Sequence, residues 1–167
     1  EALLAAARAT DAKLLYLANP DNPMGTWHKA EVITQLIAEL PESTVLILDE
    51  AYADTAPADA IPAIDVHHPR VIRMRTFSKA YGLAGLRVGY AIGHPDIVRA
   101  FDKIRNHFGV GRIAQAGALA ALQDQIHLTA TVQKNTQARA EIARIATANG
   151  LHPLPSATNF VALDCGR

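Results

Sequence analysis

The chain has 167 residues, of which 50% are hydrophobic and 19% charged, with 16 basic and 16 acidic side chains. This length can bury a hydrophobic core without a disulfide or a metal, and so apolar a composition argues against disorder. The neutral net charge disfavours nucleic acid or a membrane surface as a partner, and no apolar run approaches the ~20 residues of a membrane span. The single cysteine, Cys165, excludes an internal disulfide and fits a reducing, cytoplasmic location.

Up to Gly93 the chain alternates short apolar runs with helical patterns. The apolar runs predict strands at residues 13–18, 44–48, 71–77 and 88–92. Residues 32–40 place their apolar side chains on one face of a helix that ends at Pro41. Connections of this length favour a mainly parallel sheet, and the continuous run at 44–48 is typical of a strand buried on both faces. We therefore expect an α/β fold, a mainly parallel sheet with helices on both faces.

After Gly93 the pattern becomes helical. Helices are predicted over residues 95–108, 113–123 and 128–149, the last of them ending at Gly150. In the first of these helices Phe101, Ile104 and Phe108 form a stripe that we expect to pack in the core. A final strand is predicted near residues 159–163.

Polar residues follow each of the first three predicted strands. They are Asn22, in Asn19-Pro-Asp-Asn-Pro-Met-Gly25, then Asp49 and Tyr52 in Asp49-Glu-Ala-Tyr52, and Ser78-Lys79, with Arg87 after a turn-prone stretch. Because ligands bind at the carboxyl ends of strands in an open parallel sheet, we expect these side chains to converge. Each one alone could be a turn residue, a cap or a surface charge. Their joint placement after successive strands indicates a binding site instead.

Three ordered segments carry a family resemblance. Residues 19–25, residues 48–52 (Leu-Asp-Glu-Ala-Tyr) and residues 75–89 (Arg-Thr-Phe-Ser-Lys-Ala-Tyr-Gly-Leu-Ala-Gly-Leu-Arg-Val-Gly) resemble the signature segments of fold-type I, pyridoxal-phosphate-dependent aminotransferases. The third segment, with the order and spacing of all three, is most similar to the histidinol-phosphate aminotransferase branch. The similarity extends over essentially the whole chain, including Pro155-Ser-Ala-Thr-Asn-Phe160.

The resemblance implies a role for each of these polar residues. Lys79 would form the Schiff base with pyridoxal 5'-phosphate and then move the proton at the substrate Cα. Asp49 would face the pyridine nitrogen and keep the ring an electron sink, while Asn22 and Tyr52 would hydrogen-bond the phenolic oxygen of the ring. The catalytic residues implied are thus Lys79, Asp49 and Tyr52.

The same resemblance implies a phosphate site made by Thr76, Ser78 and Arg87, because two hydroxyls and a guanidinium suit a dianion. The reaction would be transamination, in which an amino acid or histidinol phosphate gives its amino group to a 2-oxo acid. The family also implies a homodimer. We expect the large domain at residues 1–125, a connecting helix at 126–150 and the start of a small domain at 151–167.

The sequence also departs from the family pattern. Met24 stands where the family usually has Thr, which we expect to affect the turn more than the chemistry, and Phe108-Gly-Val-Gly-Arg112 replaces an asparagine-containing stretch near the substrate. We find no segment in this sequence that resembles those with which the family supplies an aromatic residue to stack on the cofactor ring and an arginine to bind the substrate carboxylate. Because the chain also starts at Glu1 and stops soon after an apolar run, we expect it to be an internal fragment of a longer enzyme.

Other interpretations stay open. A decarboxylase or lyase of the same fold would share Asp49, Lys79 and Arg87, and a non-catalytic sensor domain of a transcription regulator could bind the same cofactor. No metal site is expected, because the adjacent His67 and His68 lack a second ligand pair at the required spacing. Cys165 is expected to be a small core residue rather than a nucleophile.

Overall fold

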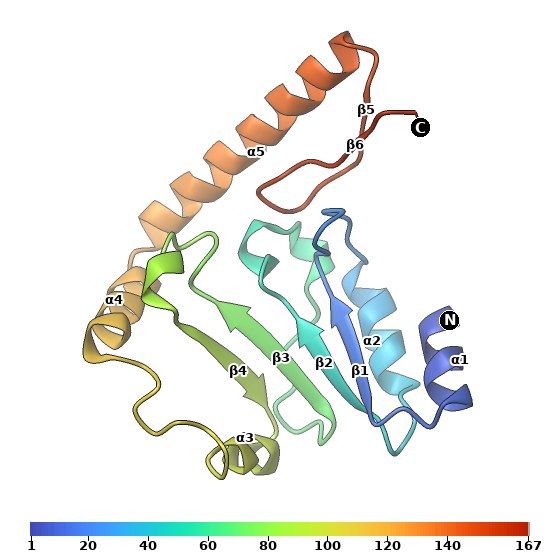
Figure 1. The fold of residues 1–167 in the computed structure, drawn as a ribbon, viewed down its shortest axis with the longest axis vertical. Coiled ribbons are helices and arrows are strands. Elements are labelled where there is room, and N and C mark those ends of the chain that lie inside the picture. Colours follow the sequence, from blue (N-terminus) through green and yellow to red (C-terminus); the bar gives the residue numbers. More distant parts are fainter. Residues whose placement is uncertain (167) are drawn as a thin grey trace.

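The computed structural model describes residues 1–166, and Arg167 lies outside the described residues. The helices are α1 (Ala2–Ala9), α2 (Ala30–Ala38), α3 (Pro95–Phe101), α4 (Arg112–Gln123) and α5 (Gln125–Ala148), with short 3-10 turns η1 (Ala53–Thr55), η2 (Ala58–Ala60) and η3 (Ala84–Leu86). The strands are β1 (Leu14–Ala18), β2 (Val45–Asp49), β3 (Val71–Thr76), β4 (Gly89–Gly93), β5 (His152–Pro153) and β6 (Leu163–Asp164) (Figure 1). None of the helices within residues 1–166 is both long and apolar enough to cross a bilayer.

The main sheet has the order β1-β2-β3-β4. The first three strands are parallel and β4 is antiparallel to β3, so the predicted, mainly parallel α/β sheet is confirmed. The chain turns back between β3 and β4 without a crossover helix, and the Phe77 N–H donates to the Val88 carbonyl at 3.2 Å. As a result β4 begins at the same edge at which β1, β2 and β3 end (Figure 1).

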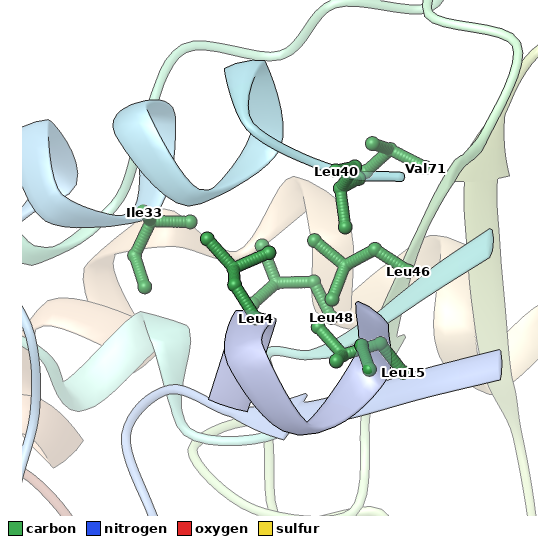
Figure 2. Close-up of a cluster of buried hydrophobic side chains, with 8 residues drawn as sticks. Leu4, Leu15, Ile33, Leu40, Leu46, Leu48 and Val71 are labelled. Atoms are coloured by element: carbon green, nitrogen blue, oxygen red, sulfur yellow. The ribbon is translucent and has the colours of Figure 1, made fainter. Parts of the chain in front are cut away.

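Helices α1 and α2 cover one face of this sheet. Figure 2 shows Leu4 of α1 and Ile33 of α2 beside Leu15 of β1 and Leu46 and Leu48 of β2, and all five side chains are buried. Strand residues alternate between faces, so Leu14, Tyr16 and Met74 lie on the opposite face, where they are exposed. Within residues 1–166, α1 and α2 therefore cover the leucine face of an α/β sheet, and Leu14, Tyr16 and Met74 mark the other face.

The predicted helix at 95–108 is too long. Helix α3 ends at Phe101, and the following residues form turns, one of which is closed by the Asn106 side chain accepting a hydrogen bond from the Phe108 N–H. Ile104 is 82% exposed and Phe108 94% exposed, so the expected core stripe is wrong. Local side-chain hydrogen bonds of this kind compete with the helix ladder.

The last part of the chain forms α5 and a short hairpin. Helix α5 starts at Gln125, three residues before its predicted start, because the Asp124 side chain accepts from the His127 N–H and caps it. The final strand predicted at 159–163 is instead β6 at Leu163–Asp164, because a polar turn centred on Ser156 occupies the preceding backbone. Cys165 is exposed, which corrects the expected core position.

Candidate active site

Hydrogen bonds of the buried Asn19 side chain and a tight turn fix the loop after β1. Asn19 is buried, its side-chain amide donates to the carbonyls of His28 and Ala60, and its oxygen accepts from the His28 N–H at 2.7 Å. The turn closes where the Gly25 N–H donates to the Asp21 carbonyl at 3.0 Å. Met24 forms part of this turn and donates its N–H to the Asp21 side chain. These contacts fix the position of Asn22 at the end of the strand.

The loop after β2 brings Asp49 and Tyr52 to the same edge. Tyr52 is buried, and its phenol oxygen accepts a hydrogen bond from the Asn22 amide at 3.3 Å. Its ring packs edge-on against Phe160, with centroids 5.6 Å apart. The turn that carries Phe160 is joined to η1, the 3-10 turn after β2, through the Thr55 hydroxyl, which donates to the Ala157 carbonyl at 2.7 Å. Residues about 100 apart in the chain therefore enclose one edge of the sheet.

Asp49 accepts two hydrogen bonds, one on each carboxylate oxygen. The Ala51 N–H donates to Oδ1 at 2.9 Å, and the Tyr16 hydroxyl donates to Oδ2 at 2.7 Å. The bond to Asp49 is the main reason why the pKa of Tyr16 is raised to about 12, with burial and the charges of Asp49 and Asp21 adding to it. Tyr16 was missed from the sequence because it lies inside an apolar run, and only the strand register could have revealed it.

Lys79 lies across the same edge from Asp49. Its ammonium nitrogen is 5.1 Å from the centre of the Tyr52 ring. A cavity of about 320 Å³ lies here, which is within the range of small-molecule sites. It is lined by Tyr16, Ala18, Pro20, Asn22, Asp49, Ala51, Tyr52 and Lys79. The structure thus brings four of the predicted site residues, Asn22, Asp49, Tyr52 and Lys79, around one cavity.

The remaining three predicted residues lie beside this cavity and do not line it. Thr76 ends β3, and its hydroxyl accepts from the Ser78 N–H at 3.0 Å. Phe77 and Val88 are hydrogen-bonded to each other across the two chain segments. Ser78 comes directly after Phe77 and Arg87 directly before Val88, so both lie at the same edge of the sheet. The Arg87 guanidinium donates to the Ala84 carbonyl at 2.7 Å and is exposed.

The two adjacent histidines have local structural roles. The His67 N–H donates to Asp65, and His68 Nδ1 accepts from the Arg70 N–H. Within residues 1–166 no three His, Cys, Asp or Glu side chains are grouped so that they could hold a metal ion.

A carboxylate, an amide–phenol pair and an amine therefore meet at the carboxyl edge of a mainly parallel sheet, and two hydroxyls and a guanidinium lie next to them. The family model of aminotransferases of class I and II matches residues 1–167. The chain belongs to this aminotransferase family. The three segments that resemble the family in sequence supply most of the cavity lining and the edge beside it.

Individual aminotransferases resemble the chain in sequence and in structure. The histidinol-phosphate aminotransferase of Sinorhizobium meliloti, solved in complex with pyridoxal-5'-phosphate, is 57% identical, with a TM-score of 0.96 over 98% of this chain and 45% of that one. Histidinol-phosphate aminotransferase 1 of Nitrosococcus oceani is 41% identical over 91% of this chain and 42% of its own length. An aromatic amino acid aminotransferase of Nocardia farcinica is 39% identical over 98% and 47%, so the chain spans less than half the length of these relatives.

Proposed function

We propose that the protein to which this chain belongs is a pyridoxal-phosphate-dependent aminotransferase that moves an amino group from an amino acid or histidinol phosphate to a 2-oxo acid. The observation that carries the proposal is the meeting of Asn22, Asp49, Tyr52 and Lys79 around one cavity. Two relatives named for histidinol phosphate and one named for aromatic amino acids support these donors as the first to test.

The residues present fit the cofactor on chemical grounds. The Asp49 carboxylate is held by two donors and keeps free lone pairs for the pyridine N–H. The bonded pair of Asn22 and Tyr52 offers an amide and a phenol to the ring oxygen. Thr76, Ser78 and Arg87 offer two hydroxyls and a guanidinium, the donors that a phosphate dianion requires.

When bound, the cofactor supplies an aldehyde carbon and an electron-withdrawing ring. The chain supplies the groups that control protons. Asp49 would hold the proton on the ring nitrogen, and the Lys79 amine, once released by the incoming donor, would take the proton from the substrate Cα and deliver it to the C4′ carbon of the cofactor. Asn22 and Tyr52 stabilise negative charge on the ring oxygen by donating hydrogen bonds.

The test uses the full-length protein with added pyridoxal phosphate. We expect a visible-edge absorbance band that is lost in Lys79→Ala and kept in Lys103→Ala, which alters an exposed lysine in the turns after α3. Mixing with single amino acids and with histidinol phosphate should then convert the bound cofactor to its amine form. A protein that stays colourless would overturn the proposal.

The same mixing experiment separates the alternatives. Release of carbon dioxide without amino-group transfer would indicate the decarboxylase or lyase. A bound band that no amine donor changes would indicate the sensor domain.

We also propose that the protein is a cytoplasmic homodimer, with residues 1–125 in the large domain, 126–150 as a connecting helix and 151–167 at the start of the small domain. The family resemblance supports the dimer, and a partner subunit would cover Ile104, Phe108 and Ile113, which are each at least 80% exposed. Sedimentation of the full-length protein tests the assembly, and a fully active monomer would contradict it.

A further inference from the structure

Tyr16 is a cavity residue to which the proposed reaction gives no task. It lies on β1, and its partner in the strand register is Ile47 of β2, two residues before Asp49. Successive side chains of a strand point to opposite faces, so Tyr16 and Asp49 share the face opposite the leucine core. The phenol reaches diagonally across to the neighbouring strand, where its oxygen lies 2.7 Å from Asp49 Oδ2.

Apart from its hydrogen bond to Asp49, the surroundings of Tyr16 give little structural reason for a tyrosine at this position. Its side chain is 59% exposed and contributes little to the buried core, in contrast to Leu15 and Leu17 on the other face. The residue lines the same cavity as Asp49 and Lys79. With a pKa raised to about 12, the hydroxyl keeps its proton at neutral pH and remains a hydrogen-bond donor.

We propose that Tyr16 is a positioning residue, whose hydroxyl fixes the Asp49 carboxylate in the orientation that meets the cofactor's ring nitrogen. This inference rests on the proposed function. Without the phenol, Asp49 retains one of its two hydrogen bonds, the one that Oδ1 accepts from the Ala51 N–H. A single hydrogen bond leaves the carboxylate free to rotate about its χ2 torsion. A ligand-binding group held by a second layer of hydrogen bonds binds more tightly than one held loosely.

The decisive experiment is a double-mutant cycle on the full-length protein, with pyridoxal phosphate as the probe and its absorbance as the readout. We expect Tyr16→Phe to raise the dissociation constant of the cofactor about tenfold, the effect of losing one hydrogen bond to a charged group. Because Tyr16 acts through Asp49, Tyr16→Phe should have no further effect in an Asp49→Asn background. Tyr90→Phe, which removes the hydroxyl of another half-exposed strand tyrosine, should bind like the wild type.

A second readout separates positioning from a structural role. We expect Tyr16→Phe to lower kcat about tenfold with the KM of the amino donor unchanged, and to leave the melting temperature of the cofactor-free protein as it is. An equal effect of Tyr16→Phe with and without Asp49, or a variant that binds like the wild type, would overturn the inference alone. A wild-type protein that does not bind the cofactor would overturn the proposed function and the inference with it.

Discussion

The Arg73 guanidinium makes two hydrogen bonds to the Glu50 carboxylate inside the protein, with Nε 2.9 Å from Oε2 and Nη2 2.5 Å from Oε1. Both side chains are almost fully buried, at 4% and 1% exposure. Arg75 adds a third bond to Oε2 at 2.7 Å. Since Glu50 directly follows Asp49, this buried ion cluster joins the loop that carries the carboxylate to β3, the strand that leads to Lys79.

Removal of Glu50 should be strongly destabilising. In Glu50→Ala the buried Arg73 guanidinium and the partly buried Arg75 guanidinium lose their counter-charge, which costs about 3–5 kcal/mol of the free energy of unfolding. Glu141→Ala is the matched control, because the ion pair of Glu141 with Arg144 is exposed and solvent-screened, and no measurable change is expected. Urea unfolding of the full-length protein measures both, and equal shifts of the two midpoints would contradict the prediction.

Replacement of Gly25 by any other residue should destabilise the fold, for two separable reasons. Its φ of +78° is unfavourable for any residue with a Cβ, at about 1–2 kcal/mol. A Cβ would also lie 2.5 Å from the Ser156 oxygen, which is held by its own bond to the Phe160 carbonyl. Gly82 has a φ of +73° but open space around it.

Comparison of Gly25→Ala with Gly82→Ala therefore separates the cost of the steric clash from the cost of the positive φ. We expect Gly25→Ala to cost about 1–3 kcal/mol more than Gly82→Ala, because only the former forces the Ser156 turn away from the sheet. Thermal unfolding of both variants checks the difference. Similar losses in the two proteins would mean that backbone strain alone matters.

The hydroxyl of Tyr52 should serve the cofactor rather than the fold. Tyr52→Phe keeps the ring packing against Phe160 and removes only the group bonded to Asn22. We expect the dissociation constant of pyridoxal phosphate to rise about tenfold, while the melting temperature changes little. Absorbance titration of Tyr52→Phe beside the Tyr90→Phe control measures the effect. A large loss of thermal stability without a change in cofactor binding would show the opposite role.

The sequence predicts which side chains gather at this edge of the sheet where each one follows a strand. Asn22, Asp49, Tyr52 and Lys79 come together because parallel strands end at one edge, and this follows from chain order alone. Tyr16 could not be found in this way. Its bond to Asp49 depends on the register of β1 against β2, which apolar patterning does not determine.

The fold was harder to predict where local hydrogen bonds override hydrophobic periodicity. The spacing of Phe101, Ile104 and Phe108 fits a helix, but Asn106 captures the Phe108 N–H in a turn instead. The polar turn at Ser156 likewise displaces the last strand toward the C-terminus. In both places a short polar side chain supplies the backbone with a partner that a pattern of apolar residues cannot anticipate.

Asp54 should destabilise the protein at neutral pH. Burial is the main influence on this carboxyl and raises its pKa, although the charge of Arg75 acts in the opposite direction. The folded state holds the Asp54 proton more tightly than the unfolded chain does. The contribution of this carboxyl to stability is therefore most favourable at pH values below its unfolded pKa of about 3.9, and it falls as the pH rises through the folded pKa. Asp54→Asn carries no charge and escapes this loss. We expect the variant to be more stable than the wild type at pH 7, with the difference shrinking toward pH 3. Urea midpoints across this range test the sign, and an advantage that grows on acidification would show that the Asp54 carboxylate stabilises the fold.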